Sequence, residues 1–152
     1  NTLTKNLIIF GQGLNKSHPH IYPLLQAVQN DDLDDFTEKF SNIVKHSIGL
    51  YFQSLKSSLF TKDVLEKQTL YFACLSNFVA LKGGAIKKEQ GLSADMASIM
   101  SNLYLAHCVN IYENDHKVSS ILRKITIEKL TNENNELFRR FITFLWDFYS
   151  NL

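Results

Sequence analysis

The chain has 152 residues, of which 45% are hydrophobic and 20% are charged, and its formal net charge is +1. A chain of this length can bury one sizeable core without disulfides or a structural metal. The small net charge excludes a strong field that would attract nucleic acid or an anionic membrane, so no nucleic-acid partner is expected.

The sequence shows no charged-then-apolar leader and no apolar run of about 20 residues, so we expect neither a signal peptide nor a transmembrane helix. Cys74 and Cys108 lie in apolar runs, where a free cysteine behaves as a small hydrophobe in a reducing compartment. We expect a cytoplasmic protein, and peripheral contact with the inner membrane stays open. Because residue 1 is Asn rather than Met, we expect a processed chain or a piece of a longer one.

The first stretch carries apolar residues at helical spacing, namely Leu3, Leu7, Phe10 and Leu14. Gly11 and Gly13 raise the alternative of a strand that leads into a dinucleotide-binding loop. That motif needs a third glycine where Lys16 stands, and Pro19 blocks the helix that should follow. The sequence therefore predicts a helix ended by the two glycines.

A proline-containing break follows the first helix. His18 and Tyr22 precede prolines, which disfavours the helical conformation for both, and Pro23 can open a short helix over 23–30. His18 and His20 flank Pro19 and project in different directions, with no further ligand at metal-binding spacing. We expect a loop with two hydrogen-bonding histidines rather than a metal site.

Asp31 or Asp32 can cap the next helix, and the acidic cluster there suits the positive end of a helix dipole. A calcium loop is disfavoured because the glycine and distal glutamate of an EF-hand are missing. Steps of three and four residues predict a long amphipathic helix with Gly49 at a close helix approach. Its apolar stripe consists of Leu33, Phe36, Phe40, Ile43, Val44, Ile48, Phe52, Leu55 and Leu59.

A further helix is predicted to start near 61–63, and its nearly all-round apolar surface indicates a central position. A turn over 87–93 follows, with Gly91 as a C-terminal cap and Ser93 as the next N-cap. The helix after it should cover Ser93 to about Glu113. Its predicted inward residues are Met96, Ile99, Met100, Leu103, Ala106 and Val109.

The last part, from Val118 to Leu152, follows a polar turn over 113–117 and should be kinked or split by the polar segment 131–136. His107 and Cys108 fall on different faces of a helix, so no nucleophilic pair is expected. The aromatic-rich segment 138–149 admits a lipid-surface function, although core filling is the simpler interpretation. The sequence thus predicts an all-α antiparallel helical bundle, four-helix-bundle-like, with a short helical N-terminal segment and no catalytic or metal constellation.

Several short motifs occur in an order that resembles a known family. They are LTK (3–5), IIFGQG (8–13), HP (18–19), NDDLDDF (30–36), GG (83–84) and LSADMASIMSNLYLA (92–106). Together they resemble the region after the catalytic Glu-Gly pair of bacterial FadE-type long-chain acyl-CoA dehydrogenases. The later half also resembles the C-terminal helical domain of very-long-chain acyl-CoA dehydrogenase. The resemblance covers residues 1 to 114 and departs from the family at Ser17 and His20.

The resemblance implies an FAD-dependent parent enzyme of fatty-acid β-oxidation that converts acyl-CoA to trans-2-enoyl-CoA. The parent's catalytic glutamate would precede Asn1, so the isolated chain is not expected to be active. Asn1 and Thr2 match positions that approach the flavin nucleotide and are the candidate cofactor-binding residues, although FAD should not be held by this chain alone. Residues 1–30 would form the end of the catalytic-domain helix with a loop and short helix, and 31–152 the C-terminal bundle, in one compact unit.

The expected partners are the catalytic domain of the same polypeptide and, for the parent, long-chain acyl-CoA. A homodimer and a peripheral membrane contact stay open. The alternative is a free-standing helical module for protein interaction or membrane-surface binding, without catalysis.

Overall fold

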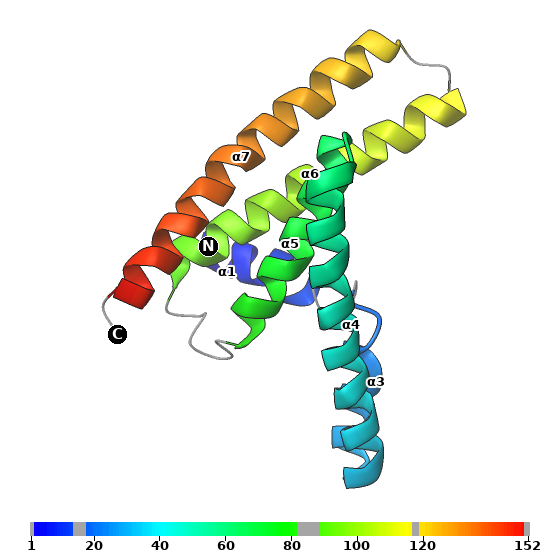
Figure 1. The fold of residues 1–152 in the computed structure, drawn as a ribbon, viewed down its shortest axis with the longest axis vertical. Coiled ribbons are helices and arrows are strands. Elements are labelled where there is room, and N and C mark those ends of the chain that lie inside the picture. The colour runs from blue at the N-terminus through cyan, green and yellow to red at the C-terminus, as the bar shows by residue number, and fades with distance from the viewer. Residues whose placement is uncertain (1, 14–17, 82–88, 117–118, 151–152) are drawn as a thin grey trace.

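The described part of the chain is almost entirely helical (Figure 1). The computed structural model describes residues 2–13, 18–81, 89–116 and 119–150. No strand occurs among those residues, so the predicted all-α class is confirmed. The elements are α1 (Thr2–Leu7), the π-helix η1 (Ile8–Gln12), α3 (Ile21–Gln29), α4 (Leu33–Phe60), α5 (Val64–Leu81), α6 (Gln90–His116) and α7 (Ser120–Ser150).

The predicted antiparallel bundle is confirmed, in an open form. Helices α6 and α7 form a long antiparallel hairpin, and α5 packs against both (Figure 1). Helix α4 packs against α5 and α3, and its N-terminal half projects with α3 away from the hairpin. Helix α1 and η1 lie against α6. Helix α5 is therefore central, as its apolar surface predicted.

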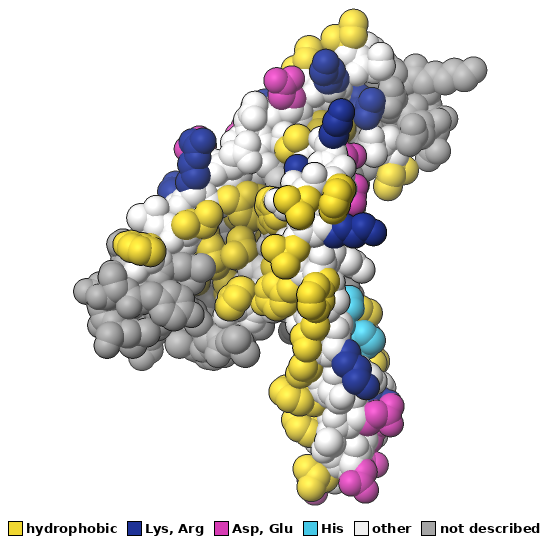
Figure 2. All heavy atoms as spheres, in the orientation of Figure 1, with side chains coloured by type: hydrophobic (Ala, Val, Ile, Leu, Met, Phe, Trp, Pro, Cys, Tyr) yellow, Lys and Arg dark blue, Asp and Glu magenta, His cyan; other side chains and the backbone are white. Residues whose placement is uncertain are grey.

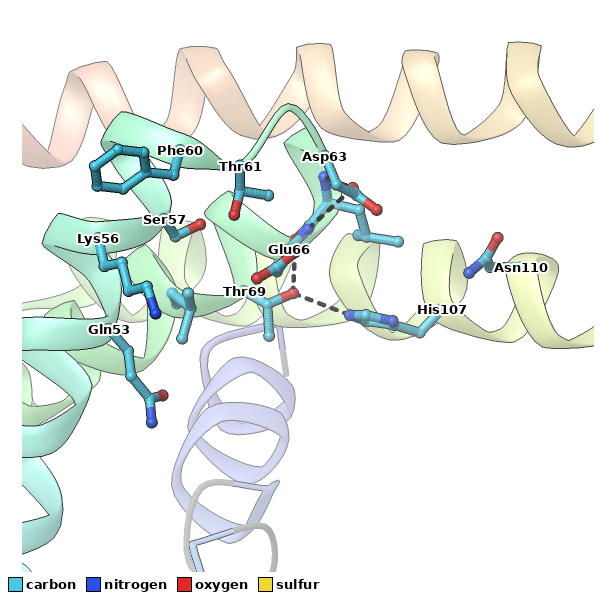
Figure 3. Close-up of a pocket in the computed structure, with 12 residues that line it drawn as sticks. Gln53, Lys56, Ser57, Phe60, Thr61, Asp63, Glu66, Thr69, His107 and Asn110 are labelled. Atoms are coloured by element: carbon cyan, nitrogen blue, oxygen red, sulfur yellow. Dashed lines mark hydrogen bonds between the residues drawn. The ribbon is translucent and has the colours of Figure 1, made fainter.

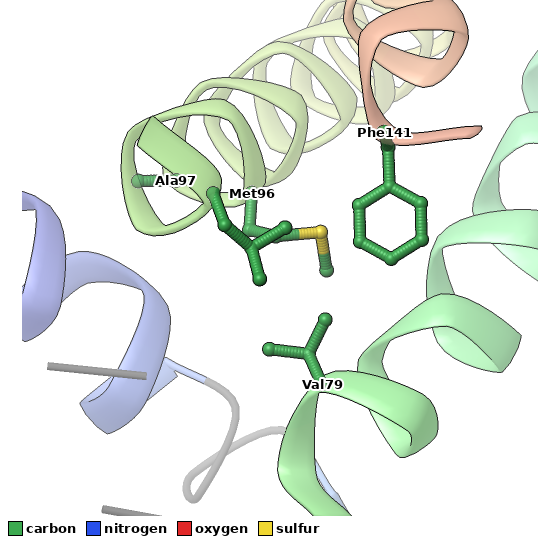
Figure 4. Packing of buried hydrophobic residues seen from close by; sticks show 5 residues of the cluster. Val79, Met96, Ala97 and Phe141 are labelled. Carbon is green, nitrogen blue, oxygen red and sulfur yellow. The ribbon is translucent and has the colours of Figure 1, made fainter. Parts of the chain in front are cut away.

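The core lies between α5, α6 and α7. In one cluster Val79, Met96 and Phe141 converge with Leu92 and Ala97, all buried (Figure 4). The second buried cluster consists of Leu65, Ile99, Leu103, Ala106 and Leu137. Four of the residues predicted to point inward from α6 are therefore in the core. The other two, Met100 and Val109, are half-buried.

A network of side-chain amides is buried between the same three helices. Gln68 of α5 and Asn134 of α7 are 3% and 0% exposed. Asn134 Nδ2 donates to Gln68 Oε1 at 3.1 Å, and Asn102 Nδ2 of α6 donates to Asn134 Oδ1 at 3.1 Å. Gln68 Nε2 donates to the Thr131 carbonyl at 2.8 Å and to Asn135 Oδ1 at 2.9 Å. The amides thereby satisfy one another inside the bundle.

This network explains why the expected break in the last helix is wrong. Helix α7 continues through 131–136 because the Asn134 side chain points inward to the amides of Gln68 and Asn102. The buried Thr131 hydroxyl is satisfied within α7, where it donates to the Ile127 carbonyl at 2.9 Å. The expected turn over 113–117 is also wrong in part, since α6 continues to His116.

The N-terminal stretch is helical, as predicted, and it continues past Gly11 to Gly13, the last residue described in this stretch. Gly11 lies inside η1, and Gly13 is still helical. A Cβ at Gly13 would lie 2.5 Å from Cε and 2.9 Å from Sδ of Met100. Gly13 therefore allows the N-terminal segment to approach α6 closely, with the flexible end of Met100 against it.

Three further expectations about local structure are corrected. Tyr22 is helical because α3 begins at Ile21 and places Pro23 in the first turn, where a backbone N–H has no helical partner to lose. Gly91 and Ser93 lie within α6, and the Ser93 N–H donates to the Glu89 carbonyl at 2.9 Å. Gly49 has open space around its Cβ position, so it marks no close approach.

The acidic cap predicted for α4 is confirmed, and α5 starts where it was predicted, also behind an acidic cap. Asp32 Oδ1 accepts the N–H of Asp35 at 2.9 Å at the start of α4. Asp63 Oδ1 accepts the N–H groups of Leu65 at 2.8 Å and Glu66 at 3.2 Å at the start of α5. Both carboxylates satisfy donors that the first turn leaves unpaired.

We expect the substitution Asn134→Leu to lower the free energy of unfolding by about 2 kcal/mol, because it leaves the buried Gln68 amide without its partner. Urea denaturation followed by circular dichroism measures the loss. Asn132→Leu, the same change at an exposed position of α7, is the matched control and should stay within about 0.5 kcal/mol. The double variant Gln68→Leu with Asn134→Leu should recover most of the loss. Equal effects at 132 and 134 would contradict the role of the network.

Candidate functional site

Two adjoining cavities lie between α4, α5 and α6. They share Thr69 and His107, which stand at the boundary between them. The first, which most of its lining residues make polar, has a volume of about 520 Å³ and is called the polar cavity. The second has largely apolar walls and a volume of about 380 Å³, and is called the apolar cavity. Both volumes fall in the range of small-molecule sites, about 300–1,000 Å³.

In the polar cavity, Thr69 Oγ1 lies 2.9 Å from His107 Nε2 and 2.8 Å from the Leu65 carbonyl oxygen (Figure 3). A hydroxyl has one proton, so when it donates to Leu65, the Nε2–H of His107 must donate to Oγ1. In that arrangement His107 cannot accept the Thr69 proton, as a general base would. The pair therefore joins α5 to α6 rather than forming a nucleophile and base.

The acidic residues of the polar cavity are exposed. Asp63 caps α5, and Glu66 lies in the first turn of the same helix. A carboxylate that serves as a base near neutral pH usually needs burial to raise its pKa. Neither Asp63 nor Glu66 is placed for that chemistry.

The apolar cavity has a wall of Leu50, Phe72, Ala73, Met100 and Leu103. Imidazoles of His18, His46 and His107 also line it. The same cavity includes Ser76 and Asn77, whose hydroxyl and amide nitrogen are buried and have no hydrogen-bond partner among the described residues. An apolar cavity with a few polar groups is the usual form of a small-ligand site.

Two of the lining histidines, His18 and His46, form a cluster with His20. The ring centroids of His18 and His20 both lie 5.2 Å from that of His46, and 6.0 Å from one another. Burial, then the His46 and His20 imidazoles, lower the pKa of His18 below its usual value. Burial, then His20, likewise lower the pKa of His46. Crowded, partly desolvated imidazoles disfavour their charged form.

The predicted hydrogen-bonding loop is confirmed for His18, whose Nδ1 accepts the backbone N–H of His20 at 3.2 Å; hydrogen bonding by the His20 imidazole stays a prediction. Among the described residues no group of three or more His, Cys, Asp or Glu is arranged to hold a metal ion. Sequence reasoning missed His46, which lies in a separate helix. No local sequence pattern indicates that the 18–20 segment packs against α4.

The other residues singled out from the sequence lie outside this histidine cluster. Asn1 lies outside the described residues, and Thr2 begins α1; their proposed cofactor contact stays a prediction. His107 is half-buried and Cys108 exposed, which confirms their separate faces. Cys74 is a free, buried thiol whose pKa burial raises.

The apolar stripe of α4 is exposed over most of its length. We call the α4 face the set Phe40, Val44, Ile48, Phe52, Leu55 and Leu59, which are between 42% and 78% exposed. Figure 2 shows hydrophobic side chains running along this helix and onto the neighbouring surface. Contiguous apolar surface on this scale usually marks an interaction site.

Comparison with known families identifies the chain's context. The family model for the acyl-CoA dehydrogenase C-terminal domain of bacterial type matches residues 15–123. The chain belongs to this family. No solved structure matches the chain.

The acyl-CoA dehydrogenase C-terminal match spans α3, α4, α5 and α6 and ends near the start of α7. It therefore includes the α4 face, the three clustered histidines and both cavities. None of the helices in the described ranges is long and apolar enough to cross a membrane.

We expect acidification to destabilise this domain in a way that depends on the histidine cluster. The unfolded chain binds protons as the pH falls through 6.5, whereas the folded His18 and His46 resist protonation because their pKa values are lowered. Their contribution to stability is present above pH 6.5 and lost as the pH falls toward the lowered pKa values. The melting temperature should therefore drop between pH 8 and pH 5.5, and His46→Gln should flatten this drop. Parallel curves for the two proteins would contradict the effect.

Proposed function

We propose that the chain is the C-terminal helical part of an FAD-dependent, long-chain acyl-CoA dehydrogenase, and that it packs through the α4 face against the catalytic domain of the same polypeptide. The parent reaction would convert acyl-CoA to trans-2-enoyl-CoA in fatty-acid β-oxidation. The observation that carries this proposal is an apolar helix face that the other described residues leave exposed, in a domain of this enzyme family.

Covering the α4 face with a complementary surface is energetically favourable. Full burial of a large apolar side chain contributes roughly 1.5–3 kcal/mol. The six side chains of the α4 face keep between 42% and 78% of their surface exposed, so a complementary surface would gain roughly several kcal/mol by covering them. A catalytic domain in the same polypeptide meets that requirement at high effective concentration.

The Gly-Gln-Gly run does not fit a dinucleotide-binding loop. A dinucleotide loop presents backbone N–H groups to phosphate at a helix N-terminus. Here the Gly-Gln-Gly run lies in the helical N-terminal stretch, and Gly13 is closed off by Met100. This supports an assignment of cofactor and catalytic base to another part of the parent.

We expect the purified chain to give no turnover with a long-chain acyl-CoA, added FAD and an artificial electron acceptor, because the base and the flavin site would lie elsewhere. An active acyl-CoA dehydrogenase in the same mixture is the control. Turnover by the chain would overturn the assignment. An independent check is the genomic frame before Asn1: an open frame that encodes Glu-Gly supports the proposal, whereas a stop codon directly before Asn1 favours a free-standing interaction module.

The packing role makes a separate prediction. Phe52→Asp should leave the melting temperature of this chain unchanged within error, because Phe52 is exposed in it. In the full parent polypeptide the same change should lower the melting temperature by several degrees, since it places a charge in the domain interface. Lys45→Asp, at another exposed position of α4, is the control and should have little effect in either protein. No difference between Phe52→Asp and Lys45→Asp in the parent would contradict docking through the α4 face.

A further inference from the structure

We propose that the apolar cavity between α4, α5 and α6 binds a small apolar molecule that carries one anionic group, with the anionic group beside the imidazoles of His18 and His46. This function goes beyond packing against a catalytic domain and does not depend on it.

The apolar side chains that line the cavity indicate that the ligand has an apolar body. Leu50, Phe72, Met100 and Leu103 surround a volume of about 380 Å³, and Ala73 leaves room between them. Such a cavity accepts one or two rings or a short branched chain. Its hydrophobic walls favour a ligand that removes apolar surface from water.

A hydrogen-bond acceptor on the ligand follows from two buried polar groups. Ser76 is 2% exposed, and its hydroxyl has no partner among the described residues. Asn77 Nδ2 is also buried and unpartnered there. An amide nitrogen can only donate, so its missing partner must be an acceptor such as a carboxylate or sulfonate oxygen.

The negative charge follows from the titratable groups around the cavity. The 18–20 segment contributes His18 and His20, α4 contributes His46 with exposed Lys45 beside it, and α6 contributes Tyr104 and His107. Helix α5 contributes only uncharged side chains, and no carboxylate is among the described lining residues. No carboxylate among these residues can pair with a protonated imidazole. An anionic ligand would therefore meet no negatively charged side chain that repels it.

The same groups make the binding pH-dependent. Without a ligand, burial and mutual repulsion hold the pKa values of His18 and His46 low. A bound anion favours the imidazolium form and raises those pKa values. By linkage, the affinity for an anion must increase as the pH falls, by roughly tenfold for each unit that one pKa rises.

A matched pair of probes tests the proposal. Naphthalene-2-sulfonate keeps its charge throughout the pH range, and naphthalene-2-sulfonamide is its neutral counterpart of nearly the same shape. Calorimetric titration at pH 5.5 and pH 8 should show that the sulfonate binds more tightly than the sulfonamide, with a preference at least about tenfold larger at pH 5.5. Absence of sulfonate binding, or equal affinities at both pH values, would overturn the proposal.

The location is tested with methionine methyl groups. The chain has two methionines. Met100 lines the cavity, whereas Met96 is 0% exposed in the core and serves as an internal control. With methyl-labelled protein, nuclear Overhauser contacts from the naphthyl ring should reach Met100 and not Met96. Contacts to neither methyl would place the probe elsewhere, such as the α4 face, and would also overturn the proposal.

Two variants separate the apolar and ionic contributions. Ala73→Phe should fill the cavity and weaken both probes at least tenfold. His18→Gln with His46→Gln should remove the pH-dependent preference for the sulfonate over the sulfonamide. Circular dichroism confirms that each variant is folded, and Ala73→Leu replaces Ala73→Phe if the larger side chain disrupts the bundle. A preference that survives the double histidine variant would contradict the role of these imidazoles.

Discussion

The hydrogen-bonded amides of Gln68, Asn102 and Asn134 are the constraint on which the packing of α5, α6 and α7 depends. Apolar side chains alone permit helices to slide by a turn with a modest change in burial, whereas a buried amide loses its partner after any such shift. The network therefore specifies one register for three helices. Leu137 and Phe141, which follow Asn134 along α7, bring this helix into the two apolar clusters.

The amide network also shows which features of this fold can be predicted from the sequence and which cannot. Helical period and acidic caps were sufficient to find α4 and α5, because those signals act within one or two turns. The polar segment 131–136 resembled a loop because periodicity treats every polar side chain as one that prefers water. Only the position of Gln68 on a neighbouring helix turns Asn134 into a core residue.

The candidate site was harder to predict for a related reason. A period of three and four residues shows that one side of α4 is apolar, but it does not say what covers that side. Gly49 shows the same limit, since a glycine in a helix indicates a close approach only when a neighbour is present. The meeting of His18 and His20 with His46 requires the chain to turn back after residue 20, and no sequence signal records that path.

Helix α4 presents two different surfaces, which has a consequence for how the domain would work within a larger enzyme. His46, Leu50, Gln53 and Ser57 line the cavities. The α4 face uses Val44, Ile48, Phe52, Leu55 and Leu59 instead. His46 and Ile48 are two residues apart, as are Leu50 and Phe52, and two residues rotate about 200° around a helix. The two stripes therefore lie on nearly opposite sides of α4. A protein surface that covered the α4 face would leave the histidine-lined cavity accessible, so docking and ligand binding can take place on the same helix at the same time.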